Sequence, residues 1–437
     1  MKKAQKRQEL IDKGIDPDNP EGSNFIHREM LTIPHSSSST TETGSESFHF
    51  TIMTYNLLAQ ALIRRKLFPT NGDILKWSKR CKVLITELKH YNSDILCVQE
   101  MDYIQYNSYW KVELGKLGYL NKYYRSGIKN HGVAIFYKES LFNFLDISHV
   151  DYDNEETGKV LPRTTTTNVG LILSLNLKKD PSKALLIGTT HLFWHPFGTY
   201  ERTRQTYVVL RKMKELQTRL KILHPEITKS WMMFAGDFNS QPFDSPYLSI
   251  TSKPIEYDGR CKTVISCSTS FTYSSLREGG SGEEEEGGNI EKFGENQPKD
   301  PVPESFKATE EQLKLVQDMQ DLHNSLPLRA ISLYSVAYKL VDPKNAGLDN
   351  DRGEPFFSNW AHTWRGLLDY IFVIRDWDVT SDKSKVDKLE DFENDNGVII
   401  NKLLKLPHKD EMGAGQPREG EYPSDHLCMI ADLTLKL

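Results

Sequence analysis

The chain has 437 residues, of which 38% are hydrophobic and 26% are charged. This composition supplies enough apolar side chains for a large core and excludes a wholly disordered protein. The formal net charge of −5 excludes a protein that coats nucleic acid with a uniformly basic surface, so any such contact would depend on local patches. Because no run of about 18 apolar residues occurs, we expect no membrane span.

The cysteines and the start of the chain indicate a reducing compartment. The five cysteines form no CxxC pair, and Cys81, Cys97 and Cys428 lie in apolar segments, as small core residues do. The polar, basic start lacks the apolar core of a secretory signal, and the acidic residues between Asp12 and Asp18 disfavour a mitochondrial transit peptide. We therefore expect a cytoplasmic and/or nuclear protein.

Residues 1–47 are interpreted as a flexible tail that begins basic and ends in a Ser/Thr run. From residue 48, short apolar runs of strand length alternate with helix-like stretches, and several runs are apolar on successive residues, as in strands covered on both faces. The predicted strands are 48–55, 94–99, 131–137, 168–177, 184–190, 231–236, 368–374 and 427–433.

Apolar residues at spacings of three and four predict helices over 74–90, 203–220 and 308–323. The Gly-, Glu- and Pro-rich stretch of about 274–304 is interpreted as a disordered acidic insertion, and 378–396 as a second polar loop. Strands and helices in this order predict an α/β sandwich, with two sheets face to face and helices outside.

Polar residues that could take part in catalysis or metal binding lie at the ends of these strands. They are Asn56, Glu100, His191, Asp237, Asn239, Asp369, Asp425 and His426. If the strand ends converge, their oxygens suit a hard ion such as Mg²⁺, whereas no HExxH motif or Cys/His cluster indicates zinc. Each residue also has an ordinary structural interpretation, such as an Asx-turn at Asp237 or a hydrogen-bonded core histidine at His191.

The order of the motifs MTYNLLAQ, CVQE, GVAIFY, TTHLFW, AGDFNS, LDYIF and SDH resembles the endonuclease/exonuclease/phosphatase superfamily over residues 48–437. The NLLAQ, HLFWHP and DYIF forms are similar to its carbon-catabolite-repressor deadenylase branch, and within that branch to the yeast Ngl-type RNA exonucleases. The leucine-rich repeats of the large deadenylases are missing, so we do not expect docking onto a large deadenylase assembly.

The resemblance implies a four-layered α/β sandwich and Mg²⁺-dependent hydrolysis of phosphodiester bonds, with one or two ions for which Mn²⁺ can substitute. It implies that Glu100 is the principal metal ligand, oriented by Asn56, and that Asp237 and Asn239 position and activate the attacking water. Asp425 completes the metal site. His191 and His426 contact the phosphate, and Asp369 orients His191 or a neighbouring residue. Such a site neutralises charge and places a hydroxide in line.

The expected substrate is the 3′ end of single-stranded RNA, in poly(A) shortening or in 3′-end processing such as ribosomal RNA trimming. Candidate contacts are Trp194, Arg202, Arg204, Trp360 and Trp364. Basic stretches around Arg202–Arg219 and Arg64–Arg80 are further candidates, or else solvated helix faces. A small-molecule dinucleotide phosphatase and a non-catalytic RNA-binding module stay open. The sequence does not predict an oligomeric state.

Overall fold

The computed structural model describes residues 5, 7–10, 25–35, 46–63, 68, 72–270, 306–380, 388–418 and 420–437. The predicted acidic insertion of 274–304 lies outside these ranges, as do Arg64 and Arg65. Within them, no helix combines the length and the hydropathy that a membrane span needs.

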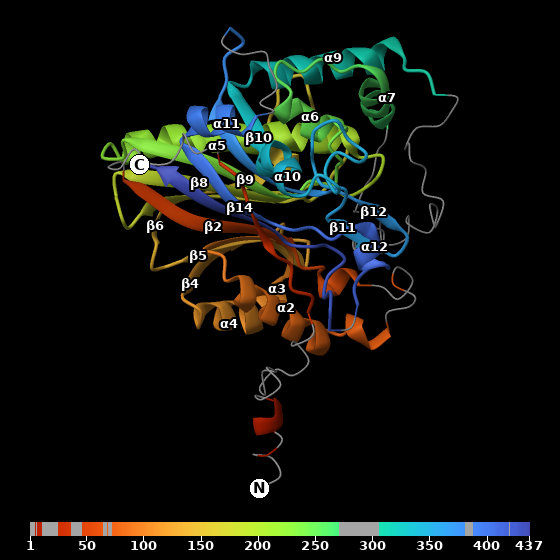
Figure 1. Ribbon diagram of the computed structural model, residues 1–437. Coiled ribbons are helices and arrows are strands. Elements are labelled where there is room, and N and C mark those ends of the chain that lie inside the picture. The colour runs from red at the N-terminus through yellow and green to blue at the C-terminus, as the bar shows by residue number, and fades with distance from the viewer. Residues whose placement is uncertain are drawn as a thin grey trace.

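Two mixed β-sheets pack face to face, and helices cover the outer face of each, which confirms the predicted four-layered α/β sandwich (Figure 1). The larger sheet has the order β1-β14-β15-β2-β3-β5-β4, and the smaller sheet has the order β10-β13-β9-β8-β7-β6. The larger sheet contains β1 (Met30–Thr32), β14 (Val398–Leu404), β15 (Met429–Lys436), β2 (Ser47–Asn56), β3 (Ile95–Asp102), β5 (His131–Lys138) and β4 (Tyr119–Tyr124). The smaller sheet contains β10 (Leu328–Ser332), β13 (Asp369–Asp376), β9 (Lys229–Asp237), β8 (Lys183–His191), β7 (Val169–Leu177) and β6 (Phe142–Asp151).

The apolar runs of the larger sheet divide their side chains between two cores. In β3, Ile95 and Cys97 join the core between the sheets, whereas Leu96 and Val98 join the core beneath the helices. Successive side chains of a strand point to opposite faces, so a strand that is covered on both sides must be apolar at every position. This explains why these strands are visible in the sequence as unbroken hydrophobic segments.

On the outside of the larger sheet lie α2 (Trp77–Tyr91), α3 (Tyr103–Gln105), η4 (Tyr106–Trp110) and α4 (Lys111–Gly115) (Figure 1). On the side of the smaller sheet lie α5 (Thr199–Leu223), α6 (Ser245–Thr251), α7 (Gly259–Ser268) and α9 (Glu310–Ser325) (Figure 1). Helix α10 (Leu333–Val341) contacts strands of both sheets, and α11 (Leu389–Asn396) contacts β14 of the larger sheet. The short helix α12 (Lys409–Met412) precedes β15, and the hairpin of β11 (Asn359–Ala361) and β12 (Trp364–Gly366) lies beside it (Figure 1). The helices predicted over 74–90, 203–220 and 308–323 correspond to α2, α5 and α9.

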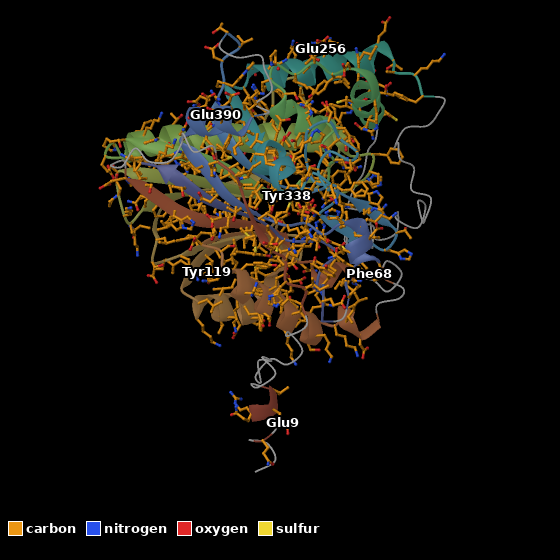
Figure 2. The ribbon with its side chains drawn as sticks, viewed as in Figure 1. Glu9, Phe68, Tyr119, Glu256, Tyr338 and Glu390 are labelled. Atoms are coloured by element: carbon orange, nitrogen blue, oxygen red, sulfur yellow. The ribbon has the colours of Figure 1, made fainter. Side chains whose placement is uncertain are left out.

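Side chains fill the space between the layers throughout the described domain (Figure 2). Tyr338 of α10 is fully buried in the core between the layers, whereas Glu390 of α11 is exposed. Helix α11 lies inside 378–396, which was expected to be a polar loop, and its Phe392 is fully buried. That prediction was wrong for 389–396, because a single buried aromatic residue is enough to anchor a short, otherwise polar helix.

The folded domain begins earlier than residue 48, so the predicted boundary of the tail needs correction. Strand β1 pairs antiparallel with β14, and Phe25 and Ile33 are buried. Arg28 donates to the carbonyl of Cys428 at 2.9 Å and lies 3.7 Å from Glu87 of α2. The sequence did not predict this segment, because a buried arginine and separate apolar residues anchor it, and not a continuous hydrophobic run.

Candidate active site

The predicted catalytic residues meet at one edge of the sandwich because of strand direction. Strand β3 runs parallel to β2, and β9 runs parallel to β8, so Asn56, Glu100, His191 and Asp237 lie at or near the carboxyl ends of these strands. Strands β13 and β15 are antiparallel to their neighbours, so Asp369 starts β13 opposite Asp237, and His426 precedes β15.

Asn56 connects the two sheets at this edge. Its Nδ2 donates to Glu100 Oε1 and to Asp237 Oδ2, both at 2.9 Å. Its Oδ1 accepts the backbone N–H of Leu58, and Glu100 Oε2 accepts the N–H of Ala59 at 2.8 Å. Asn56 thus orients Glu100, as the resemblance implied, and one amide holds the two carboxylates at a fixed separation.

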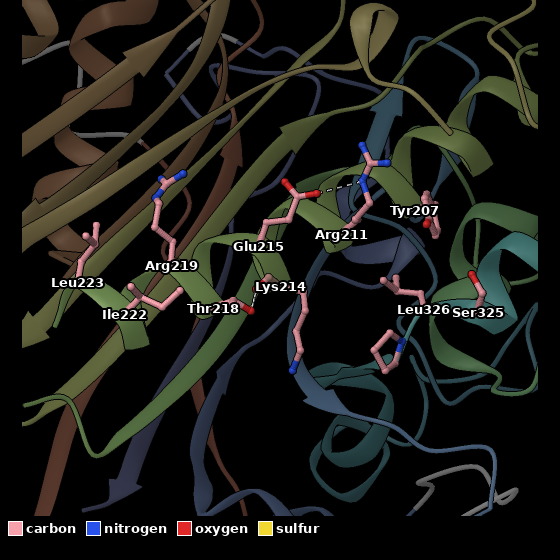
Figure 3. Close-up of a pocket in the computed structure, with 11 residues that line it drawn as sticks. Tyr207, Arg211, Lys214, Glu215, Thr218, Arg219, Ile222, Leu223, Ser325 and Leu326 are labelled. Carbon is pink, nitrogen blue, oxygen red and sulfur yellow. Dashed lines mark hydrogen bonds and ion pairs between the residues drawn. The ribbon is translucent and has the colours of Figure 1, made fainter. Parts of the chain in front are cut away.

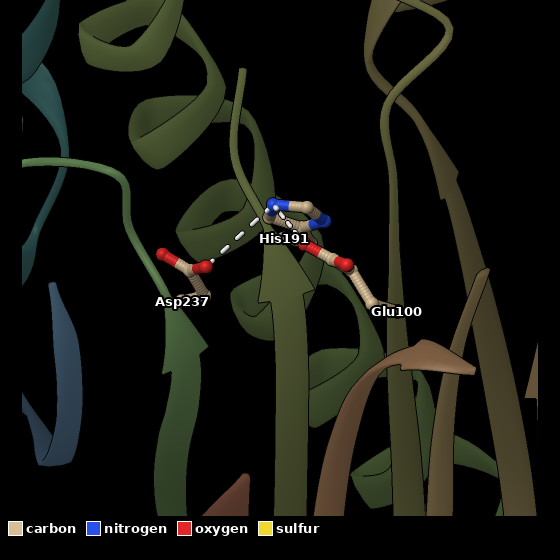
Figure 4. Close-up of side chains that lie close together, drawn as sticks. All are labelled: Glu100, His191 and Asp237. Atoms are coloured by element: carbon tan, nitrogen blue, oxygen red, sulfur yellow. Dashed lines mark ion pairs between the residues drawn. The ribbon is translucent and has the colours of Figure 1, made fainter. Parts of the chain in front are cut away.

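Two histidines approach the same oxygen of Asp237. The Nε2 atom of His191 lies 3.6 Å from Asp237 Oδ2 and 3.8 Å from Glu100 Oε1, between the two carboxylates (Figure 4). The Nε2 atom of His426 lies 3.5 Å from Asp237 Oδ2, and its Nδ1 lies 2.7 Å from Asp369 Oδ2. Asp369 therefore contacts His426 and not His191, the residue that the sequence named first as its partner.

The backbone at this edge is constrained. Glu100 and Asn239 adopt positive φ angles of 52° and 46°, which non-glycine residues rarely do outside functional sites. At Gly236 a Cβ atom would lie 2.3 Å from the carbonyl oxygen of Thr190, so only glycine allows β9 to approach β8 there. The glycine and aspartate of the AGDFN motif thus have separate tasks, the first in packing and the second in the site.

The other two predicted residues lie at the border of this cluster. The side-chain amide of Asn239 donates to the carbonyl of Leu192 at 2.9 Å, and its backbone N–H donates to Asp237 Oδ1 at 2.8 Å. The carbonyl of Asp425 accepts the N–H of Trp360 at 2.9 Å. Metal binding by Asn239 and Asp425 stays a prediction.

Burial or neighbouring charges raise the pKa values of Glu100, Asp237 and His426. Burial, reinforced by the charge of Asp425, raises the pKa of Glu100 to about 7. Burial also raises the pKa of Asp237. Burial alone would lower the pKa of His426, but the carboxylates of Asp369 and Asp237 outweigh it and raise that pKa well above its ordinary value. The site therefore favours bound protons or cations.

The donor set fits a hard divalent cation. Ligand atoms of Glu100, His191 and Asp237 lie within 4.8 Å of one another, and carboxylate oxygens are the ligands that Mg²⁺ prefers. Ligand atoms of Asp237, Asp369 and His426 also lie within 4.8 Å of one another. In that group, however, Nδ1 of His426 and Oδ2 of Asp369 are already joined by a 2.7 Å hydrogen bond. Of the two groups, the first therefore fits a cation better.

Two predicted substrate contacts are corrected by burial. Arg202 is 4% exposed and donates to the carbonyls of Phe193 and His195 and to Ser240 Oγ. Arg204 is fully buried, donates to the carbonyls of Tyr152 and Glu155, and pairs with Glu201. Their donors are directed at the protein's own backbone, so neither guanidinium is available to a strand of RNA.

Among the tryptophans, Trp360 is 6% exposed and belongs to the apolar core, so it does not form a stacking surface as predicted. Trp194 and Trp364 are half-buried, and Trp364 lies on the β11–β12 hairpin. This hairpin reaches the site, because Asn359 pairs with His426 in an isolated bridge. Substrate contact by Trp194 and Trp364 stays a prediction.

Three further residues shape the site and were not identified from the sequence. Ser358 Oγ donates to Asp369 Oδ2 at 2.7 Å, and the buried Asn168 donates to the carbonyl of His191 at 2.8 Å. Arg80, assigned above to a basic stretch, is 2% exposed and donates to the carbonyls of Leu57, Leu58 and Pro423. Of these three, only Asn168 could have been identified from the sequence, because it lies just before an apolar strand.

A separate groove of about 600 Å³ runs along the outer side of α5 and meets the end of α9 (Figure 3). Arg211, Lys214 and Arg219 line it, and they pair with Glu215, Asp376 and Asp146 respectively. The remaining lining is largely apolar and includes the exposed Ile222 and Leu223. Since the groove holds none of the clustered acids and histidines, it is not the candidate active site.

Comparison with known proteins identifies the class to which this fold and site belong. Residues 53–426 match the Endonuclease/Exonuclease/phosphatase family, and the chain belongs to that family. The chain is 55% identical to RNA exonuclease NGL2 of Saccharomyces cerevisiae, with 100% of this chain and 87% of that protein covered. It is 41% identical to Probable RNA exonuclease NGL3 of the same yeast, with 99% and 88% covered. These matches confirm the resemblance found in the sequence motifs.

Solved structures show the same fold. ANGEL2, a 2′,3′-cyclic phosphatase crystallised with adenosine-2′,3′-vanadate, superposes with a TM-score of 0.60 at 23% identity, covering 94% of this chain and 99% of that chain. The human Nocturnin catalytic domain has a TM-score of 0.51 at 18% identity, covering 89% and 97%. At these identities the likeness concerns the architecture alone.

Proposed function

We propose that this protein is a Mg²⁺-dependent 3′–5′ exoribonuclease that shortens poly(A) or trims the 3′ ends of other RNAs, ribosomal RNA included. One observation carries the proposal: Asn56 joins Glu100 to Asp237 while two histidines face the same Asp237 oxygen. The names of the two yeast relatives support RNA as the substrate. A cytoplasmic or nuclear location accords with that substrate.

In this proposal Glu100 and Asp237 hold the cation, with Asn239 and Asp425 as further ligands. A bound Mg²⁺ supplies positive charge that polarises the phosphate and makes a coordinated water more acidic. Asp237 accepts a proton from the attacking water, as a carboxylate general base. The water oxygen bonds to phosphorus, the bond from phosphorus to the 3′ oxygen breaks, and that oxygen takes up a proton.

The histidines stabilise the charge that develops on the phosphate. Asp369 accepts the Nδ1 proton of His426, which leaves Nε2 to donate towards a phosphate oxygen. His191 offers a second donor from the neighbouring strand. The products are a nucleoside 5′-monophosphate and an RNA that is shorter by one nucleotide.

A panel of substrates tests the proposal: 5′-labelled oligo-A, a mixed-sequence RNA with a 3′ hydroxyl, a 2′,3′-cyclic phosphate RNA and NADPH. We expect stepwise shortening of both RNAs that needs Mg²⁺ and is abolished in Glu100→Gln. Cleavage in EDTA would contradict the metal assignment. Turnover of NADPH or of the cyclic phosphate alone would indicate a small-molecule or end-group phosphatase. RNA binding without any turnover would indicate a binding module.

A further inference from the structure

An exposed surface adjoins the candidate active site where β3 ends. The chain leaves β3 after Asp102, and the N–H of Tyr103 donates to the carbonyl of Asn130 at 2.8 Å. This bond joins Tyr103 to the loop of residues 125–130 between β4 and β5. The same loop leads into His131, whose ring centroid lies 6.3 Å from that of His191. The chain therefore connects this surface to the site in two places, through the end of β3 and through the loop that leads into His131.

This surface, which we call the Tyr103 platform, comprises Tyr103, Ile104, Arg125 and Ile128. Tyr103 is 46% exposed, Ile104 is 74% exposed and Ile128 is 60% exposed. The Arg125 guanidinium lies 4.4 Å from the centre of the Tyr103 ring. Exposure of such large apolar side chains to water is unfavourable in free energy, and a ligand that covered them would remove this cost.

The guanidinium of Arg125 is held in place by backbone carbonyls and not by an acidic side chain. It donates to the carbonyls of Gly127 and Lys129, which hold it against the Tyr103 ring. Across the described ranges, no carboxylate forms an ion pair with Arg125. An aromatic ring with a fixed, uncompensated cation is the combination that binds single-stranded nucleic acid, because bases stack on the ring and phosphates meet the cation.

We propose that the Tyr103 platform binds the nucleotides of an RNA strand that lie more than one nucleotide upstream of the bond being cleaved. This inference rests on the proposed exoribonuclease function and adds the path of the retained strand. An exonuclease that removes one nucleotide at a time must hold the rest of the RNA near the site. Arg202 and Arg204 are buried and cannot do so, whereas the platform offers a stacking face at Tyr103, three residues after Glu100 along the chain, with the positive charge of Arg125 beside that ring.

The dependence of cleavage on RNA length tests this inference. We would measure kcat/KM for oligo-A substrates from two to twelve nucleotides long with the wild-type protein, Tyr103→Ala and Arg125→Met. Loss of a base-stacking contact typically costs about 1–3 kcal/mol, so we expect kcat/KM to fall about tenfold for long RNAs. For the dinucleotide, which does not extend to the platform, we expect a change of less than about twofold.

Leu348→Ala is a matched control, because Leu348 is also an exposed apolar residue, at 58%, but lies in the loop after α10. It should leave kcat/KM unchanged at every length. Arg125→Met should also reduce the dependence of RNA binding on salt, since one phosphate contact is lost. An equal fall for the dinucleotide and the long RNAs, or wild-type values at all lengths, would overturn the inference.

A binding measurement separates this inference from the proposed function. Oligo-A labelled with a fluorophore is titrated with Glu100→Gln and with the double variant Glu100→Gln/Tyr103→Ala. The platform predicts about tenfold weaker binding for the double variant, even if the wild-type protein fails to cleave RNA. Equal binding by both variants would overturn the platform, whereas absent cleavage by the wild type would overturn the exonuclease.

Discussion

The Nδ1 atom of His426 lies 2.7 Å from Oδ2 of Asp369, and both side chains are buried. This pair fixes which nitrogen of His426 faces Asp237 and the proposed phosphate position. A histidine held in this way by a carboxylate stays protonated to higher pH and keeps one ring orientation.

Asp369→Asn should reduce kcat about 100-fold or more, the range typical of disturbing a positioned proton donor. The variant keeps the side-chain shape, but it removes the charge that raises the pKa of His426. The alkaline limb of the pH–rate profile should therefore move to lower pH. Asp342→Asn is the control, because Asp342 pairs with His408 at 3.0 Å in another part of the fold. A wild-type profile in Asp369→Asn would contradict the orienting role.

Arg80→Lys should lower kcat about tenfold or more and raise the Mg²⁺ concentration needed for half-maximal rate. Arg80 joins the loop after Asn56 to the loop before His426 through the carbonyls of Leu57, Leu58 and Pro423, and one ammonium cannot reproduce that forked geometry. Arg329→Lys is the control: Arg329 is also buried, donates to the carbonyl of Thr251, and lies opposite Arg375 at the far end of β13 from Asp369. If the two variants lose stability equally and both keep full kcat, Arg80 is merely structural.

Arg28→Met should destabilise the protein by about 3 kcal/mol, because removing one member of a buried pair leaves the other charge unpaired. Arg28 and Glu87 are 7% and 5% exposed, and the N–H groups of Arg28 also bind Cys428. The double variant Arg28→Met/Glu87→Gln should recover part of the loss. Urea unfolding of the wild type, of Arg28→Met and Glu87→Gln, and of the double variant measures the coupling, and simple addition of the two single effects would contradict it.

Glu354→Gln should stabilise the protein at pH 8 and have little effect at pH 5. Burial raises the pKa of Glu354 to about 7 from an ordinary value of 4.5, so the folded state holds a proton that the unfolded state has lost. Stability from this group is therefore present below about 4.5 and is lost as pH rises to about 7, by at most about 3 kcal/mol. Glutamine keeps an acceptor for the Tyr247 hydroxyl, which lies 2.8 Å away. Unfolding at both pH values, with the exposed Glu390→Gln as control, measures the difference, and equal effects at both would contradict it.

The sequence predicted eight strands of the two sheets, because hydrophobicity reports burial on both faces of a strand, but it did not predict β4, β10 or β14. The segments around Ile95 and Leu185 are apolar at successive positions, and they form β3 and β8 as expected. It predicted β1 poorly, since this three-residue strand depends on pairing with β14, from the other end of the chain. Strand β6 was also missed, because half-buried positions such as Asp146 and Ser148 interrupt its apolar pattern.

The clustering of the site could be predicted from strand ends, but the partners of charged residues could not. Glu100 and Asp237 close parallel strands, so the convergence of their side chains follows from topology. Arg80 and Arg202, in contrast, were expected near RNA and instead bind backbone carbonyls of loops. Arg80 reaches the distant Pro423, and Arg202 reaches the nearby Phe193. Charge in a sequence shows that a group needs partners, but it does not show whether those partners are phosphates or peptide carbonyls.

The central position of β15, between β14 and β2, has a consequence for synthesis in the cell. Strand β15 is the last strand of the chain, and His426 immediately precedes it. A nascent chain that still lacks residues 424–436 has an unpaired edge on β2 and no histidine opposite Asp369. Under the proposed function, translation must therefore pass this point before the chain holds both its complete larger sheet and the histidine that faces Asp369.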